Sequence, residues 1–303
     1  MDVHFLQSEP WAHFQESLGK QTFTEVGDGW HFMVIVESSA GIKRLYCPYG
    51  PLVTSDDALQ AALASLTRLG NKIGATFLRI QPVGLTFSRE NIANYHAQPI
   101  AYTQPSHTWC LDLSQSEDEL YAAMKQNTRN ICRNYPKKGL TYRQSHDPSD
   151  ISHLNRLLAT TASHNHITVH DAAYLAQQAI SLLADDAASI HLIEYQNESI
   201  AAALVYEGEA THYYAHAASS FANRNLGAAT ALLGEIIFDA KAKGKQVMDL
   251  YGIAPTDDPT HRWAGFTKFK KSFGGYPVTY NQTYDIPLKH TSYLLYKVLK
   301  HLR

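Results

Sequence analysis

The sequence predicts an α/β protein with two units, each built from a mixed β-sheet and its own helices. Segments with helical periodicity alternate with strand-like segments along the whole chain. A helix at 55–72 followed by a strand at 76–80 resembles a helix at 225–243 followed by a strand at 246–250, and two or three strands precede each pair. The 303 residues are long enough for two domains of ordinary size.

Local patterns predict the elements of the first half of the chain. The β-branched and aromatic segments 31–36 and 43–47 are typical of two strands joined by a turn. The helix at 55–72 has acidic residues in its first turn, and its apolar residues recur at helical spacing, at Leu59, Ala62, Leu66 and Leu69. The apolar run 76–80 predicts a buried strand. After a strand at 107–113, Ser116 with Glu119 forms a capping box that predicts a continuous helix as far as Asn134, and a strand at 140–143 follows.

The second half continues the alternation. The expected helices and strands are 150–163, 171–184, 189–195, 199–206, 210–217, 225–243 and 247–250. We place the boundary between the units in the polar stretch near residue 145, so the expected domains are 1–145 and 146–286. The last segment, 287–303, predicts a basic amphipathic helix whose apolar side carries Tyr293, Leu294, Val298 and Leu302.

Composition restricts the class of protein. The formal net charge of −2 and the isoelectric point near 6.8 exclude a globally basic nucleic-acid binder, so any RNA contact must come from a local patch. The three cysteines, Cys47, Cys110 and Cys132, have no metal-ligand spacing and are expected to be buried thiols. A signal peptide is not evident, and no window holds the ~20 apolar residues of a membrane span, so we expect a cytoplasmic protein.

Common catalytic motifs are missing from the sequence. It contains no GxSxG, HExxH, Walker or GxGxxG motif. His164, His166 and His170 come closest to a metal-ligand pattern, but no cysteine or carboxylate ligand accompanies them. We therefore expect neither a metal nor another cofactor.

Three local features indicate binding or catalysis. The segment 125–143 carries six basic and no acidic residues, which favours phosphate or RNA, although a solvated face is the alternative: Lys125, Arg129, Arg133, Lys137, Lys138 and Arg143. In the segment from Lys268 to Gly275, two phenylalanines four apart would anchor the chain. Lys268 and Lys271 lie three apart, whereas Lys270 points elsewhere. The phenylalanines would fix a lysine that stabilises negative charge, unless the lysines are merely a surface helix end. The pattern from Arg224 to Ala229 resembles the pyrophosphate loop of acyl-CoA-dependent N-acetyltransferases.

Taken together, these features resemble the Fem-type family, which builds peptidoglycan cross-bridges on two GNAT-like (acyl-N-acyltransferase) domains. The landmarks occur in family order along nearly the whole chain: Trp11 and Phe14, Gly50-Pro51, Leu78-Arg79 before Pro82, Pro105 to Leu113, Lys137-Lys138-Gly139, Tyr213-Tyr214 to Ala218-Ser219, Asp249-Leu250 with Gly252, Phe269-Lys270 with Phe273-Gly274-Gly275, and Tyr284-Asp285. The resemblance implies transfer of an amino acid from aminoacyl-tRNA to the side-chain amine of the peptidoglycan stem peptide. It also implies a C-terminal helix that returns to the first domain.

The resemblance also assigns candidate site residues. Lys270 matches the lysine thought to stabilise the charge that develops at the tRNA 3′ end, and no dedicated general base is expected. The substrate-binding candidates are Gln15, Gln81, His170, Tyr174, Tyr214 and Arg224. The tRNA-binding candidates are Arg129, Arg133, Lys137, Lys138, Lys268 and Lys271.

Three of these positions depart from members that act on the soluble precursor UDP-MurNAc-pentapeptide. Gln15 stands in place of a lysine, Gln81 in place of an aspartate, and His170 in place of an arginine four residues before a tyrosine. A glutamine cannot act as a counter-charge for pyrophosphate, and a histidine can do so only when protonated. These departures favour the lipid-linked precursor, lipid II.

Other readings remain open at this point. The basic C-terminal helix could touch an anionic membrane surface, although packing on the first domain is the stronger reading. An acyl-CoA-dependent N-acyltransferase is the second hypothesis, and a non-catalytic module that binds the precursor or RNA is the third. We expect the protein to act as a monomer in the cytoplasm, with possible peripheral contact at the inner face of the membrane.

Overall fold

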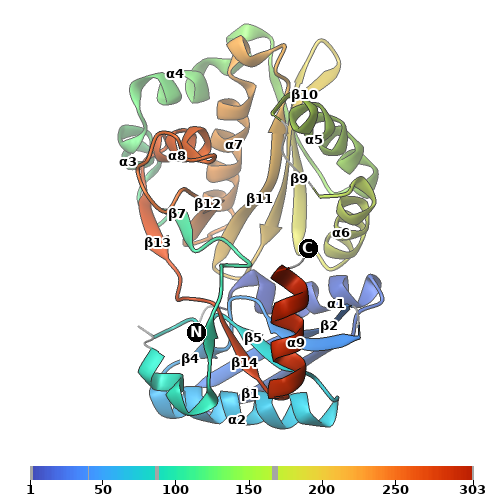
Figure 1. The fold of residues 1–303 in the computed structure, drawn as a ribbon. Helices are drawn as coiled ribbons and strands as arrows, with labels where there is room; N and C mark the ends of the chain where they lie inside the picture. The colour runs from blue at the N-terminus through green and yellow to red at the C-terminus, as the bar shows by residue number, and fades with distance from the viewer. Residues whose placement is uncertain (1–2, 40, 86–88, 166–169, 302–303) are drawn as a thin grey trace. The chain divides into compact units, whose positions relative to one another are not determined.

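The computed structural model describes residues 3–39, 41–85, 89–165 and 170–301, and the chain forms two compact units (Figure 1). The first unit comprises Val3–Ser106 and Thr279–Arg303, and the second comprises His107–Val278. The chain therefore passes into the second unit at His107, not near residue 145 as expected. It does so because two strands before residue 145, β7 (His107–Asp112) and β8 (Thr141–Ser145), hydrogen-bond in the second sheet. Pairing between distant strands leaves no mark in local composition.

The first unit contains a seven-stranded mixed sheet in the order β1-β2-β3-β5-β14-β6, with β4 paired to β2. Its strands are β1 (Thr22–Gly27), β2 (Trp30–Ser39), β3 (Ile42–Cys47), β4 (Leu52–Val53), β5 (Phe77–Ile80), β6 (Gln98–Pro99) and β14 (Tyr284–Pro287). Its helices are η1 (Phe5–Gln7), α1 (Glu9–Ser17), α2 (Asp56–Lys72), η2 (Arg89–Tyr95) and α9 (His290–His301). Helix α2 starts at the N-cap Ser55 and buries Leu59, Leu63 and Leu66 against the sheet, as its periodicity predicts.

The C-terminal segment completes this first unit. Strand β14 pairs with β5, and an ion pair joins the two strands: both guanidinium nitrogens Nε and Nη2 of Arg79 donate to Asp285, at 2.8 and 2.9 Å. Both side chains are almost fully buried. The hydroxyl of Tyr293 on α9 donates to the same carboxylate at 3.1 Å, and its ring contacts Phe77. Within the described residues, no helix has both the length and the apolar character needed to cross a bilayer.

The apolar side predicted for α9 is largely wrong. Of its predicted apolar residues, Tyr293 is buried, but Leu294 and Val298 are exposed, and Leu302 lies outside the described residues. The helix packs through tyrosines because their hydroxyls reach the buried Asp285–Arg79 pair, which aliphatic side chains cannot satisfy.

The second unit contains a seven-stranded mixed sheet in the order β13-β7-β12-β11-β10-β9-β8. Its other strands are β9 (Ala188–Tyr195), β10 (Glu198–Glu207), β11 (Thr211–Ser219), β12 (Val247–Gly252) and β13 (Tyr276–Thr279). Its helices are α3 (Glu117–Ala123), α4 (Gln126–Asn134), η3 (Tyr135–Lys138), η4 (Pro148–Asp150), α5 (Ile151–Asn165), α6 (Ala172–Ala184), η5 (Arg224–Leu226), α7 (Ala228–Ala242) and α8 (Ala264–Lys271). Helix α7 covers one face of the sheet, and α5 with α6 covers the other (Figure 1).

Two helix predictions need correction. The capping box of Ser116 and Glu119 is present, but the helix it opens ends at Ala123, and a second helix starts at Gln126. Extended backbone at Met124 and Lys125 separates them, because the Lys125 N–H donates to the Ser272 carbonyl instead of continuing the helix. Helix α7 likewise starts at Ala228, after a short 3₁₀ turn, and not at 225. The three cysteines are buried and free, as predicted.

The glycine at 275 allows β13 to approach β7. Its φ is +91°, and a Cβ there would lie 2.2 Å from the Cys110 carbonyl oxygen. Gly275→Ala is therefore expected to lower the free energy of unfolding by about 2–4 kcal/mol, from left-handed strain plus a backbone clash. Gly244→Ala is the matched control, because Gly244 also has a positive φ, of +74°, but a Cβ added there would meet no neighbouring side chain or backbone atom within 4 Å. It should cost about 1 kcal/mol. Urea denaturation measures both, and equal losses would contradict the close approach.

Candidate active site

The site is organised around a splay between two parallel strands. Strands β11 and β12 are hydrogen-bonded only from Thr211 to Tyr213 on β11, opposite Val247 to Asp249 on β12. Beyond Tyr213, β11 continues beside β10 alone. On β12, an irregularity after Asp249 and the left-handed φ of +63° at Tyr251 turn the strand away. The opening exposes the ends of both strands to side chains from the surrounding helices.

Helix α8 delivers a lysine to this opening. Phe273, just after the helix, is fully buried, and its ring packs edge-on against Phe269 at 5.4 Å between centroids. This anchor fixes the rotation of α8. The Lys270 Nζ thereby donates to the carbonyl oxygen of Gly252, at the end of β12, at 2.7 Å. The predicted anchoring by the two phenylalanines is confirmed.

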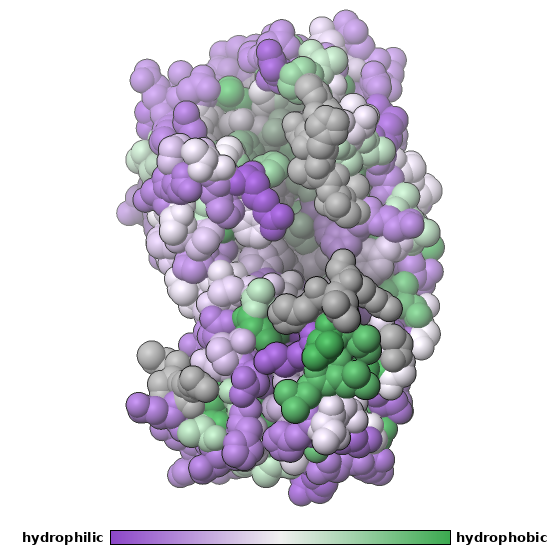
Figure 2. Space-filling view, in the orientation of Figure 1, coloured by the Kyte–Doolittle hydropathy of each residue, from purple (hydrophilic) through white to green (hydrophobic). Residues whose placement is uncertain are grey.

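Lys270 lines a cavity of about 350 Å³. This volume suits a small ligand or one end of a larger ligand. Its wall is made by the end of β11, the start of α7, helix α5 and helix α8, and the recess between α5 and α8 is visible in Figure 2. Most of the lining is apolar. The residues are Leu158, Thr160, Thr161, Tyr214, Ala217, Ala218, Ser219, Ser220, Phe221, Arg224, Ala229, Phe266, Phe269 and Lys270. Three predicted site residues, Lys270, Tyr214 and Arg224, are thus brought together.

Lys270 and the neighbouring Asp249 both have shifted pKa values. Desolvation lowers the pKa of Lys270 to about 8, and the nearby Asp249 carboxylate opposes part of this shift. Desolvation raises the pKa of Asp249 to about 6, although its Oδ1 accepts the Tyr251 N–H at 2.6 Å. A lysine with a pKa close to neutral can both carry charge and exchange its proton during a reaction.

The rim of the cavity suits an anionic group next to a flat ring. The guanidinium of Arg224 lies 4.6 Å from the Phe221 ring centroid, and Phe221 and Phe266 are about half exposed, at 52% and 51%. Gly227, with a φ of +78°, is the N-cap of α7, and no side chain caps the helix there. Ala229 in the first turn of this helix lines the cavity, so the positive end of the α7 dipole faces it.

The other two lysines of the Phe-Lys segment, Lys268 and Lys271, lie on a different side of α8. Together with Lys125, they line a separate cavity of about 420 Å³. This cavity is also large enough for part of a larger ligand. The Lys271 ammonium pairs with Asp257 at 2.7 Å and lies 5.4 Å from the Trp109 ring centroid. The spacing argument that Lys270 points away from Lys268 and Lys271 is therefore correct.

The basic residues that follow α3 do not share one helical face. Lys125 is the N-cap of α4 and lies outside the helix that carries Arg129 and Arg133. The Arg133 guanidinium stacks on the Tyr121 ring at 4.4 Å, and Arg129 donates to the Tyr121 carbonyl at 3.4 Å.

The two lysines that follow have local partners. Lys137 donates to the Asn134 side chain at 2.7 Å, and Lys138 donates to the Leu226 carbonyl at 3.1 Å. Lys138 thus ties this segment to the turn that carries Arg224. Both lysines remain exposed.

His170 and Tyr174 form a separate cluster in the second unit. Their rings stack at 5.0 Å, and the ring of His216 meets His170 edge-on at 5.3 Å. Desolvation lowers the pKa of His170, so this side chain is neutral near pH 7 and does not replace the charge of an arginine. The side chains of His164 and His166, from the same histidine group, lie outside the described residues.

Gln15 and Gln81 lie in the first unit, and both are buried. The Gln15 Oε1 accepts a hydrogen bond from Lys20 at 2.8 Å, so a positive charge stands beside the position where a lysine was expected. Gln81 donates to the Asn281 carbonyl at 3.3 Å. Both amides therefore have contacts within the fold.

Sequence reasoning missed two kinds of residue. Asp249 and the exposed Phe221 and Phe266 were not among the candidates, although an aspartate within an apolar strand is a usable signal. A second polar cluster also went unnoticed: among the described residues, His191, Glu207 and Asp239 place possible ligand atoms within 4.8 Å of one another. The Lys243 ammonium lies 2.9 Å from Glu207 and 3.1 Å from Asp239, so this cluster already contains a cation.

Comparisons with known proteins agree with this fold. Residues 184–301 match the FemAB family. The crystal structure of FemX is similar over 97% of this chain and 94% of that chain, with a TM-score of 0.86 at 17% identity. No curated protein has a matching sequence. The resemblance to the Fem-type family predicted from the sequence is therefore confirmed.

Two other solved structures share the fold. They are the C-terminal domain of a putative lysylphosphatidylglycerol synthetase from Agrobacterium fabrum and L-PGS from Bacillus licheniformis. Their TM-scores are 0.62 and 0.57, at 12% and 13% identity. They cover 92% and 91% of this chain, and 88% and 86% of their own. The predicted fold class, an α/β protein with two units built on mixed sheets, is confirmed.

Proposed function

We propose that this protein is an aminoacyl-tRNA-dependent transferase that adds an amino acid to the side-chain amine of the peptidoglycan stem peptide. The observation that carries the proposal is the position of Lys270. Its ammonium group lies in an apolar cavity where two parallel strands part, with a pKa near 8. The match of residues 184–301 to the FemAB family and the similarity to FemX support a bridge-forming transferase of this kind.

The proposed reaction is attack of a neutral amine on an aminoacyl ester. The new bond joins the amine nitrogen to the ester carbonyl carbon, and the bond that breaks joins that carbon to the ribose oxygen. The Lys270 ammonium stabilises the negative charge that moves onto the departing ribose oxygen and donates a proton to it. The amine loses one proton in return, which restores the ammonium, so no separate general base is required. Positioning in the cavity supplies the remaining rate enhancement.

The cavity rim supports an RNA end as the donor. Phe221 and Phe266 offer exposed rings on which a terminal base can stack. Arg224 and the start of α7 offer positive charge for a phosphate group. We assign Lys268, Lys271, Lys137 and Lys138, with Arg129 and Arg133, to contacts with the rest of the acceptor stem.

We further propose that the acceptor is the lipid-linked precursor, and that transfer takes place on the cytoplasmic side of the membrane. The departures at Gln15, Gln81 and His170 from members that act on the soluble precursor support this choice, and His170 beside Tyr174 is neutral near pH 7.

An acyl-CoA-dependent N-acyltransferase is the second candidate. The Arg224 turn and the start of α7 border the same cavity, and a CoA pyrophosphate would suit them as well. The exposed phenylalanines do not separate the two donors, because an adenine ring occurs in both.

Label transfer separates these candidates. The purified protein is incubated with seryl-, alanyl- or glycyl-tRNA carrying a labelled amino acid, together with lipid II or UDP-MurNAc-pentapeptide, and separately with labelled acetyl-CoA. We expect label to move from one of the tRNAs onto the stem-peptide amine, with lipid II as the better acceptor. Label that moved only from CoA would overturn the proposal.

A further inference from the structure

The outer face of α9 is an exposed aliphatic stripe. Leu294, Leu295, Val298 and Leu299 are 61%, 57%, 57% and 44% exposed. Their spacing places them together on one side of the helix, and Figure 2 shows a hydrophobic patch over α9. A contiguous apolar patch of this kind marks an interaction surface more often than chance exposure.

The stripe takes no part in anchoring the helix. Tyr293 and Tyr296 face Phe77 and the Arg79–Asp285 pair, and these contacts hold α9 to the sheet. The aliphatic side chains are therefore available for a partner outside this unit.

The charge around the stripe indicates which partner fits. Residues 288–303 contain no aspartate or glutamate. Lys289 and Lys297 are both exposed on this segment, with the Lys297 ammonium 6.0 Å from the Tyr293 ring centroid. Aliphatic residues flanked by cations are the pattern of helices that lie in a membrane interface. A second copy of the same surface would bring like charges together, which disfavours self-association.

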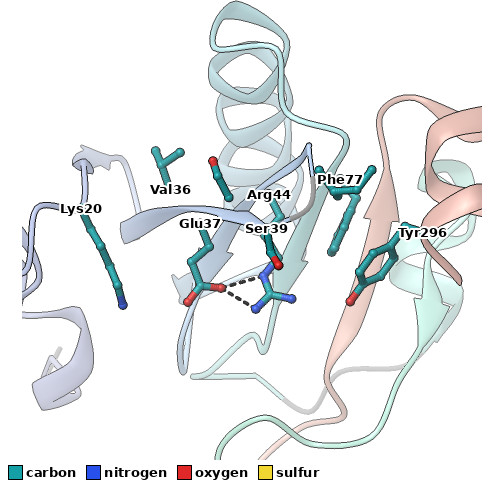
Figure 3. Close-up of a pocket in the computed structure, with 9 residues that line it drawn as sticks. Lys20, Val36, Glu37, Ser39, Arg44, Phe77 and Tyr296 are labelled. Atoms are coloured by element: carbon teal, nitrogen blue, oxygen red, sulfur yellow. Dashed lines mark hydrogen bonds and ion pairs between the residues drawn. The ribbon is translucent and has the colours of Figure 1, made fainter. Parts of the chain in front are cut away.

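A cavity of about 440 Å³ opens beside α9, large enough for a headgroup, and Tyr296 of that helix lies on its rim (Figure 3). Lys20 and Arg44 line the cavity, and Glu37 pairs with Arg44 at 2.6 Å. Glu37 therefore neutralises Arg44, and the charge of Lys20 makes the cavity net positive. A phosphate group is the matching ligand for such a cavity at a membrane surface.

We propose that the first unit docks on an anionic phospholipid bilayer. The aliphatic stripe of α9 enters the headgroup region, and the adjoining cavity takes a lipid phosphate beside Lys20. This inference concerns binding alone and does not depend on which donor or acceptor the second unit uses.

Vesicle flotation tests the stripe. Wild-type protein should float with vesicles of phosphatidylcholine mixed with phosphatidylglycerol and not with phosphatidylcholine alone, and added salt should weaken the binding. The double variant Leu295→Gln with Val298→Gln should lose about tenfold or more in vesicle affinity, because two aliphatic side chains no longer leave water. Val26→Gln is the matched control, because Val26 is 72% exposed in the same unit but lies on β1, and its affinity should not change.

The cavity is tested with Lys20→Gln, which should weaken binding to vesicles that contain phosphatidylglycerol. All substituted side chains are at least partly exposed, and thermal unfolding checks that the variants fold. Wild-type protein that stays unbound, or a double variant that floats as well as wild type, would overturn the proposal. So would a dimer in sedimentation equilibrium that the double variant dissociates, because the stripe would then be a contact between copies.

Discussion

Replacing Lys270 with methionine is expected to lower kcat for amino-acid transfer by about 10²–10³-fold, the usual effect of losing one preorganised donor to a developing oxyanion. Methionine fills a similar volume and keeps the apolar contacts of α8, so the loss should come from the missing ammonium group. Lys270→Arg should not restore the rate, because the larger guanidinium cannot occupy the site 2.7 Å from the Gly252 carbonyl without displacing the chain. Single-turnover kinetics with labelled aminoacyl-tRNA measures the effect.

Lys245→Met serves as the control for this substitution. Lys245 also donates from its ammonium to a backbone carbonyl, that of Gly208 at 2.8 Å, but it lines none of the described cavities that carry the proposed chemistry. Its kcat should stay within about threefold of wild type, as expected for a surface position. If Lys270→Met kept full activity, or left the cell-wall phenotype of a strain unchanged, the protein would be a binding module instead of an enzyme.

The pH dependence of the same reaction follows from the lysine pKa. The attacking amine must be neutral, and an ordinary lysine-type amine has a pKa of about 10.4, so the rate rises with pH at first. The Lys270 ammonium is lost above its pKa of about 8, which cancels the further gain. We expect the rate to level off near pH 8 in the wild type. In Lys270→Met it should be lower throughout and still rising at that pH.

Replacing Asp285 with alanine is expected to lower the free energy of unfolding of the first unit by about 3–5 kcal/mol. The substitution leaves Arg79 charged and buried without its bidentate partner, and it also removes the acceptor of the Tyr293 hydroxyl. Because these contacts hold α9 to the sheet, proteolysis should cut near residue 289 sooner in this variant than in the wild type. Chemical denaturation monitored by circular dichroism gives the free energy.

Two comparisons isolate the buried pair. Glu37→Gln breaks an ion pair of similar length, to Arg44, in which both side chains are 26% exposed, and it should cost only about 0–1 kcal/mol. The double variant Arg79→Met with Asp285→Leu should recover much of the loss, since no unpaired charge then remains buried. A single variant Asp285→Ala as stable as Glu37→Gln would contradict the assigned role of the pair.

The sequence determined most of the local structure and one feature of the site. The helices 55–72 and 171–184 and the strands β2, β3, β5 and β7 to β12 were predictable, because apolar periodicity and capping residues act over a few neighbouring residues. The sequence predicted no strand at β1, β4, β6, β13 or β14. The same local reasoning placed Lys270 apart from Lys268 and Lys271, since a helix anchored by Phe269 and Phe273 fixes where each side chain points.

Tertiary structure alone decided the rest. The entry of the chain into the second unit at His107, the splay of β11 from β12 and the shifted pKa values at Asp249 and Lys270 all depend on residues far apart in sequence. The orientation of α9 shows why. Its sequence offers two apolar sides, one aromatic and one aliphatic, and helical periodicity cannot choose between them. The aromatic side packs on the sheet because the hydroxyl groups of Tyr293 and Tyr296 hydrogen-bond with the buried Arg79–Asp285 pair. The aliphatic stripe therefore lies on the surface.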